Sequence, residues 1–91
     1  MDDYRRKLLY RAWRRGFREA DLIFGSFADD HLAGLNPEEL EAFERLLEAP
    51  DQEVFGWLMG RSNVPAAFDT PLFARIQAYR FVPATERSDE G

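Results

Sequence analysis

The sequence predicts an all-α protein that folds as a small five-helix bundle in a single domain. Apolar residues recur at helical spacing along the chain, and no strand-like alternation persists. Helix-start and helix-stop residues divide this pattern into five segments with short connections between them. Because the chain has 91 residues, one domain with a modest core is expected. We expect this helical domain to span residues 1–83 and a disordered polar tail to follow over residues 84–91.

The first two helices carry apolar stripes, and a glycine follows the first of them. Helix one is expected over about residues 3–14, and Gly16 stands where a left-handed C′ glycine would end it. Helix two is expected from near Phe17 to near Gly34. Gly25 lies inside it and costs ~1 kcal/mol relative to alanine, so either packing compensates or another group approaches the backbone closely.

The third helix has the clearest boundaries. Asn36 is the expected N-cap, Pro37 is the first helical residue, and Glu39 completes a capping box. Pro50 stops this helix, because proline lacks the N–H that a helix interior requires.

Two shorter helices follow. Asp51 is the expected N-cap of helix four, Gly60 ends it, and Trp57 lies on the flank of its apolar stripe. Thr70 is the expected N-cap of helix five, and Val82-Pro83 ends that helix. One shared core is expected from the stripes of these helices and the two before them. Its predicted members are Phe24, Phe27, Phe43, Leu47, Phe55, Leu58, Phe73 and Ile76.

Composition excludes several kinds of chemistry. The chain has no cysteine, which removes disulfides, cysteine zinc sites and thiol catalysis, and its one histidine, His31, cannot form a histidine cluster. No pair of acidic residues has the context of a general acid–base site, and no glycine-rich phosphate loop is present. No apolar run is long enough for a membrane span, and no signal-peptide pattern opens the chain. We therefore expect a cytoplasmic protein that is not an enzyme and holds no metal, and we assign His31 no role.

Charge is distributed unevenly. The net charge is −5, yet residues 1–18 carry seven bases against two acids, and residues 19–91 carry five bases against fifteen acids. This asymmetry indicates either an N-terminal face for an anionic partner, or a solvated helix face whose arginines pair with the protein's own acids. The alternative function is a small nucleic-acid-binding or regulatory protein that acts through the basic first helix. The acidic total and the lack of a clear recognition helix count against it.

Two sequence blocks carry a resemblance to a known family. The first contains Arg-Gly-x-x-Glu within Arg14-Arg15-Gly16-Phe17-Arg18-Glu19-Ala20-Asp21. The second is Phe43-Glu44-Arg45-Leu46-Leu47-Glu48, followed by Asp51 and Val54-Phe55-Gly56-Trp57-Leu58-Met59. Together these blocks resemble the succinate dehydrogenase flavinylation factors, the family called SdhE in bacteria. The resemblance covers roughly residues 4–80.

The resemblance implies a specific function. Such factors bind the flavoprotein subunit of succinate dehydrogenase, or of fumarate reductase, and promote covalent attachment of FAD to a histidine of that subunit. The bond-forming residues belong to the subunit, so the factor is implied to be a chaperone-like protein of the bacterial cytoplasm that binds no cofactor tightly itself. Carried over by the motif, the implied partner-binding residues are Arg15, Gly16 and Glu19, with Arg14 and Arg18 as neighbours.

The motif has two physical interpretations. In the structural one, Gly16 caps the first helix, Glu19 interacts with the positive end of the second, and Arg15 pairs with Glu19. In the functional one, Gly16 lets a partner backbone come close, and Arg15 offers a bidentate fork to a carboxylate, a carbonyl or the FAD pyrophosphate. Spacing alone leaves both open, and the family resemblance favours the second.

Overall fold

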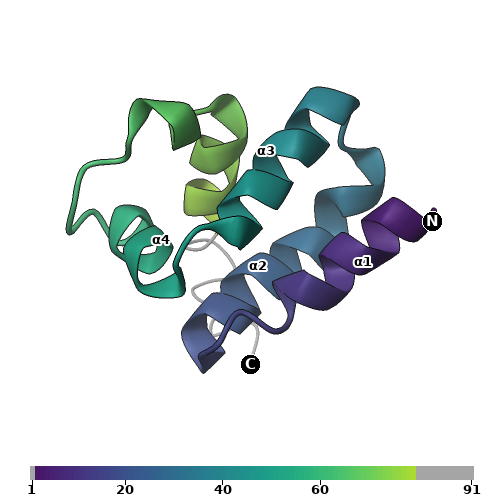
Figure 1. The fold of residues 1–91 in the computed structure, drawn as a ribbon, viewed down its shortest axis with the longest axis horizontal. Helices are drawn as coiled ribbons and strands as arrows, with labels where there is room; N and C mark the ends of the chain where they lie inside the picture. Colours follow the sequence, from purple (N-terminus) through teal and green to yellow (C-terminus); the bar gives the residue numbers. More distant parts are fainter. Residues whose placement is uncertain (1, 80–91) are drawn as a thin grey trace, which may run out of the picture.

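Two antiparallel helices begin the fold. In the computed structural model, which describes residues 2–79, α1 (Asp3–Ala12) and α2 (Arg18–His31) lie side by side and are joined by a short turn (Figure 1). The first helix ends two residues earlier than the sequence predicts: Trp13 is its C-cap, and the Arg14 N–H then bonds to the Arg11 carbonyl at 3.0 Å, which is a tighter turn than that of an α-helix. The second begins one residue after Phe17, its N-cap, and tightens into a 3-10 turn, η1 (Leu32–Gly34), so the helical pattern does reach Gly34.

The boundary of the third helix is confirmed. Helix α3 (Pro37–Glu48) starts with a complete capping box. The side chain of Asn36 accepts a hydrogen bond from the Glu39 N–H at 2.8 Å, and the Glu39 carboxylate accepts one from the Asn36 N–H at 2.9 Å. Two backbone donors at the start of α3 are thereby satisfied.

Helix α4 (Asp51–Leu58) corrects one prediction: Pro50 is its N-cap, and Asp51 is already its first helical residue. The side chain of Asp51 therefore does not cap α4 and is free to make another contact. Gly60 has a φ of +76°, as expected of a glycine that ends a helix. After the 3-10 turn η2 (Ala66–Phe68), residues 71–79 are helical, and the Thr70 hydroxyl accepts a hydrogen bond from the Phe73 N–H at 3.2 Å. The predicted end at Val82-Pro83 and the predicted tail lie outside the described residues.

The helices enclose one core, and polar contacts join the elements around it. The Tyr4 hydroxyl on α1 donates to Glu44 on α3 at 2.6 Å, and the Tyr79 hydroxyl donates to the Ser26 carbonyl on α2 at 3.1 Å. The core is a single cluster of buried side chains drawn from α1 to α4 and from residues 71–79. Of the eight predicted members, seven belong to it: Phe24, Phe27, Phe43, Leu47, Leu58, Phe73 and Ile76.

The predictions for Phe55 and Trp57 are wrong: the sequence predicts Phe55 in the core and Trp57 on the flank of the stripe, and the structure has them the other way round. Trp57 is 6% exposed and belongs to the core, whereas Phe55 is half-buried and lies outside that cluster. The reason lies in the loop after α4, where Phe68 folds back and packs at 5.0 Å against the Trp57 ring. Phe55 instead meets Phe17 edge to face at 5.1 Å, beside the turn between α1 and α2.

Candidate partner-binding surface

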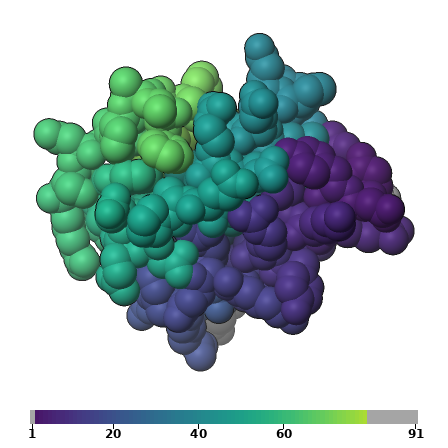
Figure 2. Space-filling view, in the orientation of Figure 1, coloured from purple at the N-terminus to yellow at the C-terminus, as the bar shows by residue number. Residues whose placement is uncertain are grey.

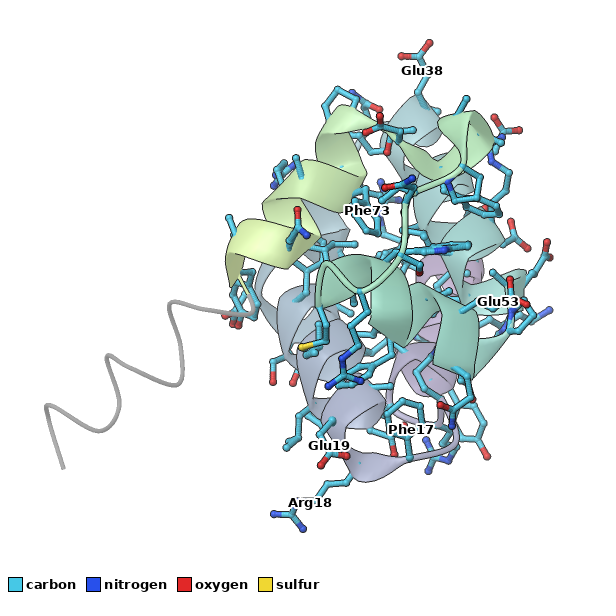
Figure 3. All side chains as sticks on the ribbon, turned by 90° about the vertical axis from the view of Figure 1, so that its left-hand side faces the viewer. Phe17, Arg18, Glu19, Glu38, Glu53 and Phe73 are labelled. Atoms are coloured by element: carbon cyan, nitrogen blue, oxygen red, sulfur yellow. The ribbon has the colours of Figure 1, made fainter. Side chains whose placement is uncertain are left out.

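The motif residues occupy the turn between α1 and α2 and the first turn of α2. Arg14, Gly16, Arg18 and Glu19 are exposed, but Arg15 is only 6% exposed. Figure 3 shows Arg18 and Glu19 pointing away from the body of the molecule at the same end. The motif therefore has an outward part and a buried part.

The guanidinium of Arg15 contacts the end of α3 and the start of α4. Nη1 donates to the Leu47 carbonyl, Nη2 donates to the Ala49 carbonyl at 3.1 Å, and Nη2 lies 2.8 Å from Oδ1 of Asp51. The last carbonyls of a helix lack intrahelical partners and carry partial negative charge, so a cation there is favourable. Arg15 thus presents its fork to carbonyls and a carboxylate of its own chain.

Burial and charge act on Arg15 in opposite directions. Desolvation lowers the pKa of its guanidinium from the ordinary value, and the nearby Asp51 carboxylate raises it. The ring of Phe24 lies 5.2 Å from the guanidinium carbon, within cation–π range. Within residues 2–79, Nε of Arg15 is buried and has no hydrogen-bond partner. A buried arginine held this way depends on its carboxylate, because an unpaired buried charge is costly.

Gly16 has a backbone conformation that few other residues adopt. Its φ is +126°, which makes any side chain strained there. It stands beyond the C′ position of α1, so the prediction that it is the C′ cap is wrong. A Cβ on residue 16 would also come closer than 3.0 Å to Oδ2 of Asp51, a separation that real Cβ atoms do not adopt.

Gly25 explains how α1 and α2 approach each other. A Cβ at this position would overlap three ring atoms of Trp13, each closer than 3.0 Å. The indole thus lies directly on the α2 backbone, and its Nε1 donates to Asp29 at 3.3 Å. One explanation predicted for Gly25 was that another group approaches the backbone closely. The structure confirms this explanation, and the group is the Trp13 indole of the same chain.

The outward residues make few contacts with the rest of the protein. Arg14 stacks on the Tyr10 ring at 3.7 Å and donates to the Tyr10 carbonyl at 3.3 Å. In the part of the chain that the structure describes, Glu19 has neither an ion-pair partner nor a side-chain hydrogen bond, so the predicted Arg15–Glu19 pair does not form.

The N-terminal bases divide into those that are engaged within the protein and those that have no carboxylate nearby. Arg5 donates to the Leu32 and Leu35 carbonyls, Arg11 lies 3.8 Å from Glu44, and Arg15 is paired with Asp51. By contrast, no carboxylate within residues 2–79 lies within 4.0 Å of the side chains of Lys7, Arg14 or Arg18. Figure 2 shows the surface of α1 continuing into that of the α1–α2 turn and early α2, from purple to dark blue. The unpaired cations belong to these segments, and all three are exposed.

Two carboxylates of the site are missed by the sequence interpretation. Asp21 accepts a hydrogen bond from the Arg15 N–H, and Asp51 pairs with the Arg15 side chain. Asp21 follows the motif closely, and a short polar residue there could have been recognised as a turn cap. Asp51 is 36 positions away from Arg15 and carries no local signal of this pairing.

Other sites of chemistry are not apparent in the described region. Within residues 2–79, no group of three His, Asp or Glu side chains is placed to hold a metal ion, and no helix is long and apolar enough to cross a membrane. His31 packs against the rings of Phe27 and Tyr79 at 5.0 and 5.6 Å. A hollow between the N-terminal half of α3 and residues 70–72 is lined by Glu38, Glu39, Glu41 and Arg45, among others.

Comparison with known proteins identifies the family. Three relatives illustrate the similarity, and each is a succinate dehydrogenase or FAD assembly factor by name. "Succinate dehydrogenase assembly factor 2, mitochondrial" of Dictyostelium discoideum is 35% identical over 77 residues, covering 85% of this chain and 55% of the relative. The protein of the same name from Cryptococcus neoformans var. neoformans is 37% identical over 76 residues, covering 82% and 43%. "FAD assembly factor SdhE" of Acetobacter pasteurianus is 39% identical over 72 residues, covering 79% and 66%.

The match extends over most of this chain, although it spans only about half the length of the first two relatives. The family model described as "Flavinator of succinate dehydrogenase" matches residues 6–80, which include the buried and the outward parts of the motif. The family resemblance drawn from the two sequence blocks is therefore confirmed, and the chain belongs to the family of succinate dehydrogenase flavinators.

Proposed function

We propose that this protein is an assembly factor that binds the flavoprotein subunit of succinate dehydrogenase, or of fumarate reductase, and promotes covalent attachment of FAD to that subunit. Membership of the flavinator family carries the proposal. The names of the relatives, which are assembly factors from both a bacterium and eukaryotes, support it.

The partner surface is the outward side of the α1–α2 turn. It consists of Arg14, the exposed backbone of Gly16, Arg18 and Glu19, and Arg15 supports it from beneath. Within residues 2–79, Arg14, Arg18 and Glu19 have no ion-pair partner, so their side chains can form charged hydrogen bonds with a polar protein surface. Arginine is also common among residues that dominate binding energy at interfaces.

The factor acts by binding and not by catalysis. If it binds most tightly to the subunit conformation in which the histidine and the flavin ring are aligned, it increases the population of that conformation. The groups that form the bond then belong to the subunit and to FAD. A factor of this kind holds no cofactor of its own.

Delivery of FAD by the factor is a weaker mechanism. The hollow beside α3 is lined by three glutamates and one arginine, and this balance of charge opposes the anionic pyrophosphate of FAD. We therefore place FAD on the subunit when the factor binds.

We place the protein in the bacterial cytoplasm, with its similarity to the Acetobacter pasteurianus factor as support. The alternative function, nucleic-acid binding through the first helix, depends on free bases along that helix. Arg5 and Arg11 are instead engaged with α3 or the turn before it, which weakens the alternative.

A reconstituted reaction tests the function. Purified flavoprotein subunit without covalent flavin is mixed with FAD, with and without the factor, and covalent flavin is followed by fluorescence of the denatured subunit in a gel. We expect the factor to increase the rate of attachment. A second mixture of factor, FAD and a histidine-containing peptide should form no adduct.

Two results would reject the proposal. An attachment rate that is unchanged by saturating factor would remove the assembly role. Adduct formation on the peptide, in the absence of the subunit, would show that the factor is itself an enzyme.

A further inference from the structure

Arg15 and Gly16 share one neighbour, the carboxylate of Asp51 in the first turn of α4. Oδ1 of Asp51 lies 2.8 Å from Nη2 of Arg15. Oδ2 of Asp51 occupies the space where a side chain on residue 16 would begin. One carboxylate thus contacts two consecutive residues of the motif, from a segment 35 positions away in the sequence.

This contact gives Gly16 an internal reason to lack a side chain. The positive φ of +126° disfavours a side chain at this position, and a Cβ there would require the Asp51 carboxylate, which is paired with Arg15, to shift. Neither reason requires a partner backbone close to Gly16.

The turn is held from two sides. Asp21, in the first turn of α2, accepts the Arg15 N–H, and Asp51 pairs with the Arg15 guanidinium. Arg15 is held by both carboxylates. The exposed Arg14 precedes it in the sequence, and the exposed Arg18 and Glu19 follow it. The positions of the outward side chains depend on both contacts.

We infer that Asp51 is a positioning residue for the partner surface: its carboxylate holds Arg15 and Gly16 in the backbone geometry that presents Arg14, Arg18 and Glu19. This inference rests on the proposed function, because it states how the surface that binds the flavoprotein subunit is kept in shape. It places the side chain of Arg15 beneath the surface and gives Gly16 an internal reason to lack a side chain. Contact with the partner is left to the exposed backbone of Gly16 and to the exposed side chains around it.

The first test compares Asp51→Asn with Glu53→Gln. Both variants remove one carboxylate charge from the first turn of α4, and Glu53 is exposed (Figure 3). Backbone amide resonances of residues 14–19 should shift clearly in Asp51→Asn and remain close to wild type in Glu53→Gln. At a temperature where circular dichroism shows wild-type helicity, Asp51→Asn should need about fivefold more factor for half-maximal attachment. Its maximal rate should equal that of wild type.

A merely structural role would not give this pattern, because a fully folded variant would then have the wild-type half-saturating concentration. Arg15→Lys is the second variant, in case Asp51→Asn does not reach wild-type helicity. It keeps the positive charge but lacks the two-pronged contact, so it should shift the same amides.

The second test is a double-mutant cycle between residues 16 and 51. Gly16→Ala should slow attachment strongly in the wild-type background, where it meets both the backbone strain and the Asp51 carboxylate. In an Asp51→Ala background only the strain remains, so the same substitution should have a smaller effect. If Gly16 serves only the approach of a partner, Gly16→Ala should slow attachment by the same factor in the wild-type and Asp51→Ala backgrounds.

The outcomes separate the inference from the proposed function. The inference would be overturned if folded Asp51→Asn kept both its amide resonances and its half-saturating concentration. It would also be overturned if Gly16→Ala had the same effect in both backgrounds of the double-mutant cycle. If wild-type factor promotes no attachment at all, the proposed function fails, and the amide resonances alone decide whether Asp51 positions the turn.

Discussion

At the scale of single residues, the guanidinium of Arg15 is buried and binds carbonyls and a carboxylate of its own chain. An exposed arginine commonly makes such contacts with a partner protein. Its two-pronged donor set matches two carbonyls at the end of α3 and a carboxylate at the start of α4. Glu19, four positions later, points outward. A motif that is contiguous in the sequence thus divides between the interior and the surface.

Gly25 and Trp13 form a second residue-scale pair that can be tested. Gly25→Ala should destabilise the fold by up to about 2 kcal/mol, because overpacking costs about 1–3 kcal/mol and alanine regains ~1 kcal/mol of helix propensity. In a Trp13→Ala background the ring is absent, so Gly25→Ala should be neutral or stabilising. Urea unfolding of the four proteins measures both effects, and equal effects in the two backgrounds would contradict the Trp13 contact.

Tyr4 makes stability depend on pH in the alkaline range. The hydrogen bond to Glu44, with some desolvation, raises the pKa of the Tyr4 hydroxyl from 10.0 to about 12. The folded state therefore favours neutral tyrosine, and this contribution is present below pH 10 and is lost as the pH rises towards about 12. The thermal midpoint of wild type should fall relative to that of Tyr4→Phe across this range. A constant difference between the two proteins from neutral pH to pH 12 would contradict the shift.

Residue roles were the least predictable part of the site from the sequence. The spacing of Arg15 and Glu19 suggests a local pair, whereas the actual partner of Arg15 lies in another helix. Pairing between distant segments depends on how the helices pack, which no local pattern specifies. The glycine at position 25 was recognisable as unusual, but its neighbour Trp13 was identifiable only once α1 and α2 were placed side by side.

At the scale of elements, helix starts are predicted well because side-chain caps are local. The Asn36–Glu39 box and the Thr70 cap both form as the sequence indicates. The first residue of α4 is shifted by one because Pro50, whose side chain cannot cap, takes the N-cap position, and Asp51 turns to Arg15. At this position the ion pair between Asp51 and Arg15 replaces the local preference of aspartate for capping a helix.

Loss of the α3 cap should have a measurable cost. Asn36→Ala removes the acceptor of the Glu39 N–H and should lower the free energy of unfolding by about 0.5–2 kcal/mol. Asn36→Ser is the matched control, since serine also caps helices and should recover most of the loss. Urea unfolding measures both variants, and equal stability of Asn36→Ala and wild type would mean that the box contributes nothing.

At the scale of the whole molecule, the all-α fold follows from periodicity and the core from the stripes of the helices. The described residues confirm both, with Phe55 and Trp57 as the exceptions. These two lie on opposite flanks of a stripe only eight residues long, so the pattern could not decide between them. Trp57 is the buried one of the two because the loop after α4 packs Phe68 against its ring.

Phe43 lies at the centre of this core. It is fully buried, with the rings of Phe24 and Phe27 each 6.1 Å away. Phe43→Ala should cost about 3–5 kcal/mol, because it leaves a cavity among rigid neighbours. Phe55→Ala should cost clearly less, since that side chain is half-buried. Chemical denaturation of both variants tests this order, and a cost below about 1 kcal/mol for Phe43→Ala would contradict the central place of its ring.

We propose that the outward side of the α1–α2 turn binds the flavoprotein subunit, and the variant Glu19→Ala tests this proposal. Glu38→Ala is the matched control: both glutamates are exposed in the first turn of a helix, and they lie at opposite ends of the molecule (Figure 3). Each substitution removes a helix-dipole interaction worth less than ~1 kcal/mol, so both proteins should remain folded.

The measurement is fluorescence of covalent flavin on the denatured subunit in a gel, from cells that carry wild-type, Glu19→Ala or Glu38→Ala factor at equal levels. Glu19→Ala should reduce covalent flavin by about tenfold, as expected when an interface contact worth about 1.4 kcal/mol is lost, and Glu38→Ala should leave it unchanged. Full flavinylation with folded Glu19→Ala factor, or equal loss with both variants, would contradict the assignment of this surface.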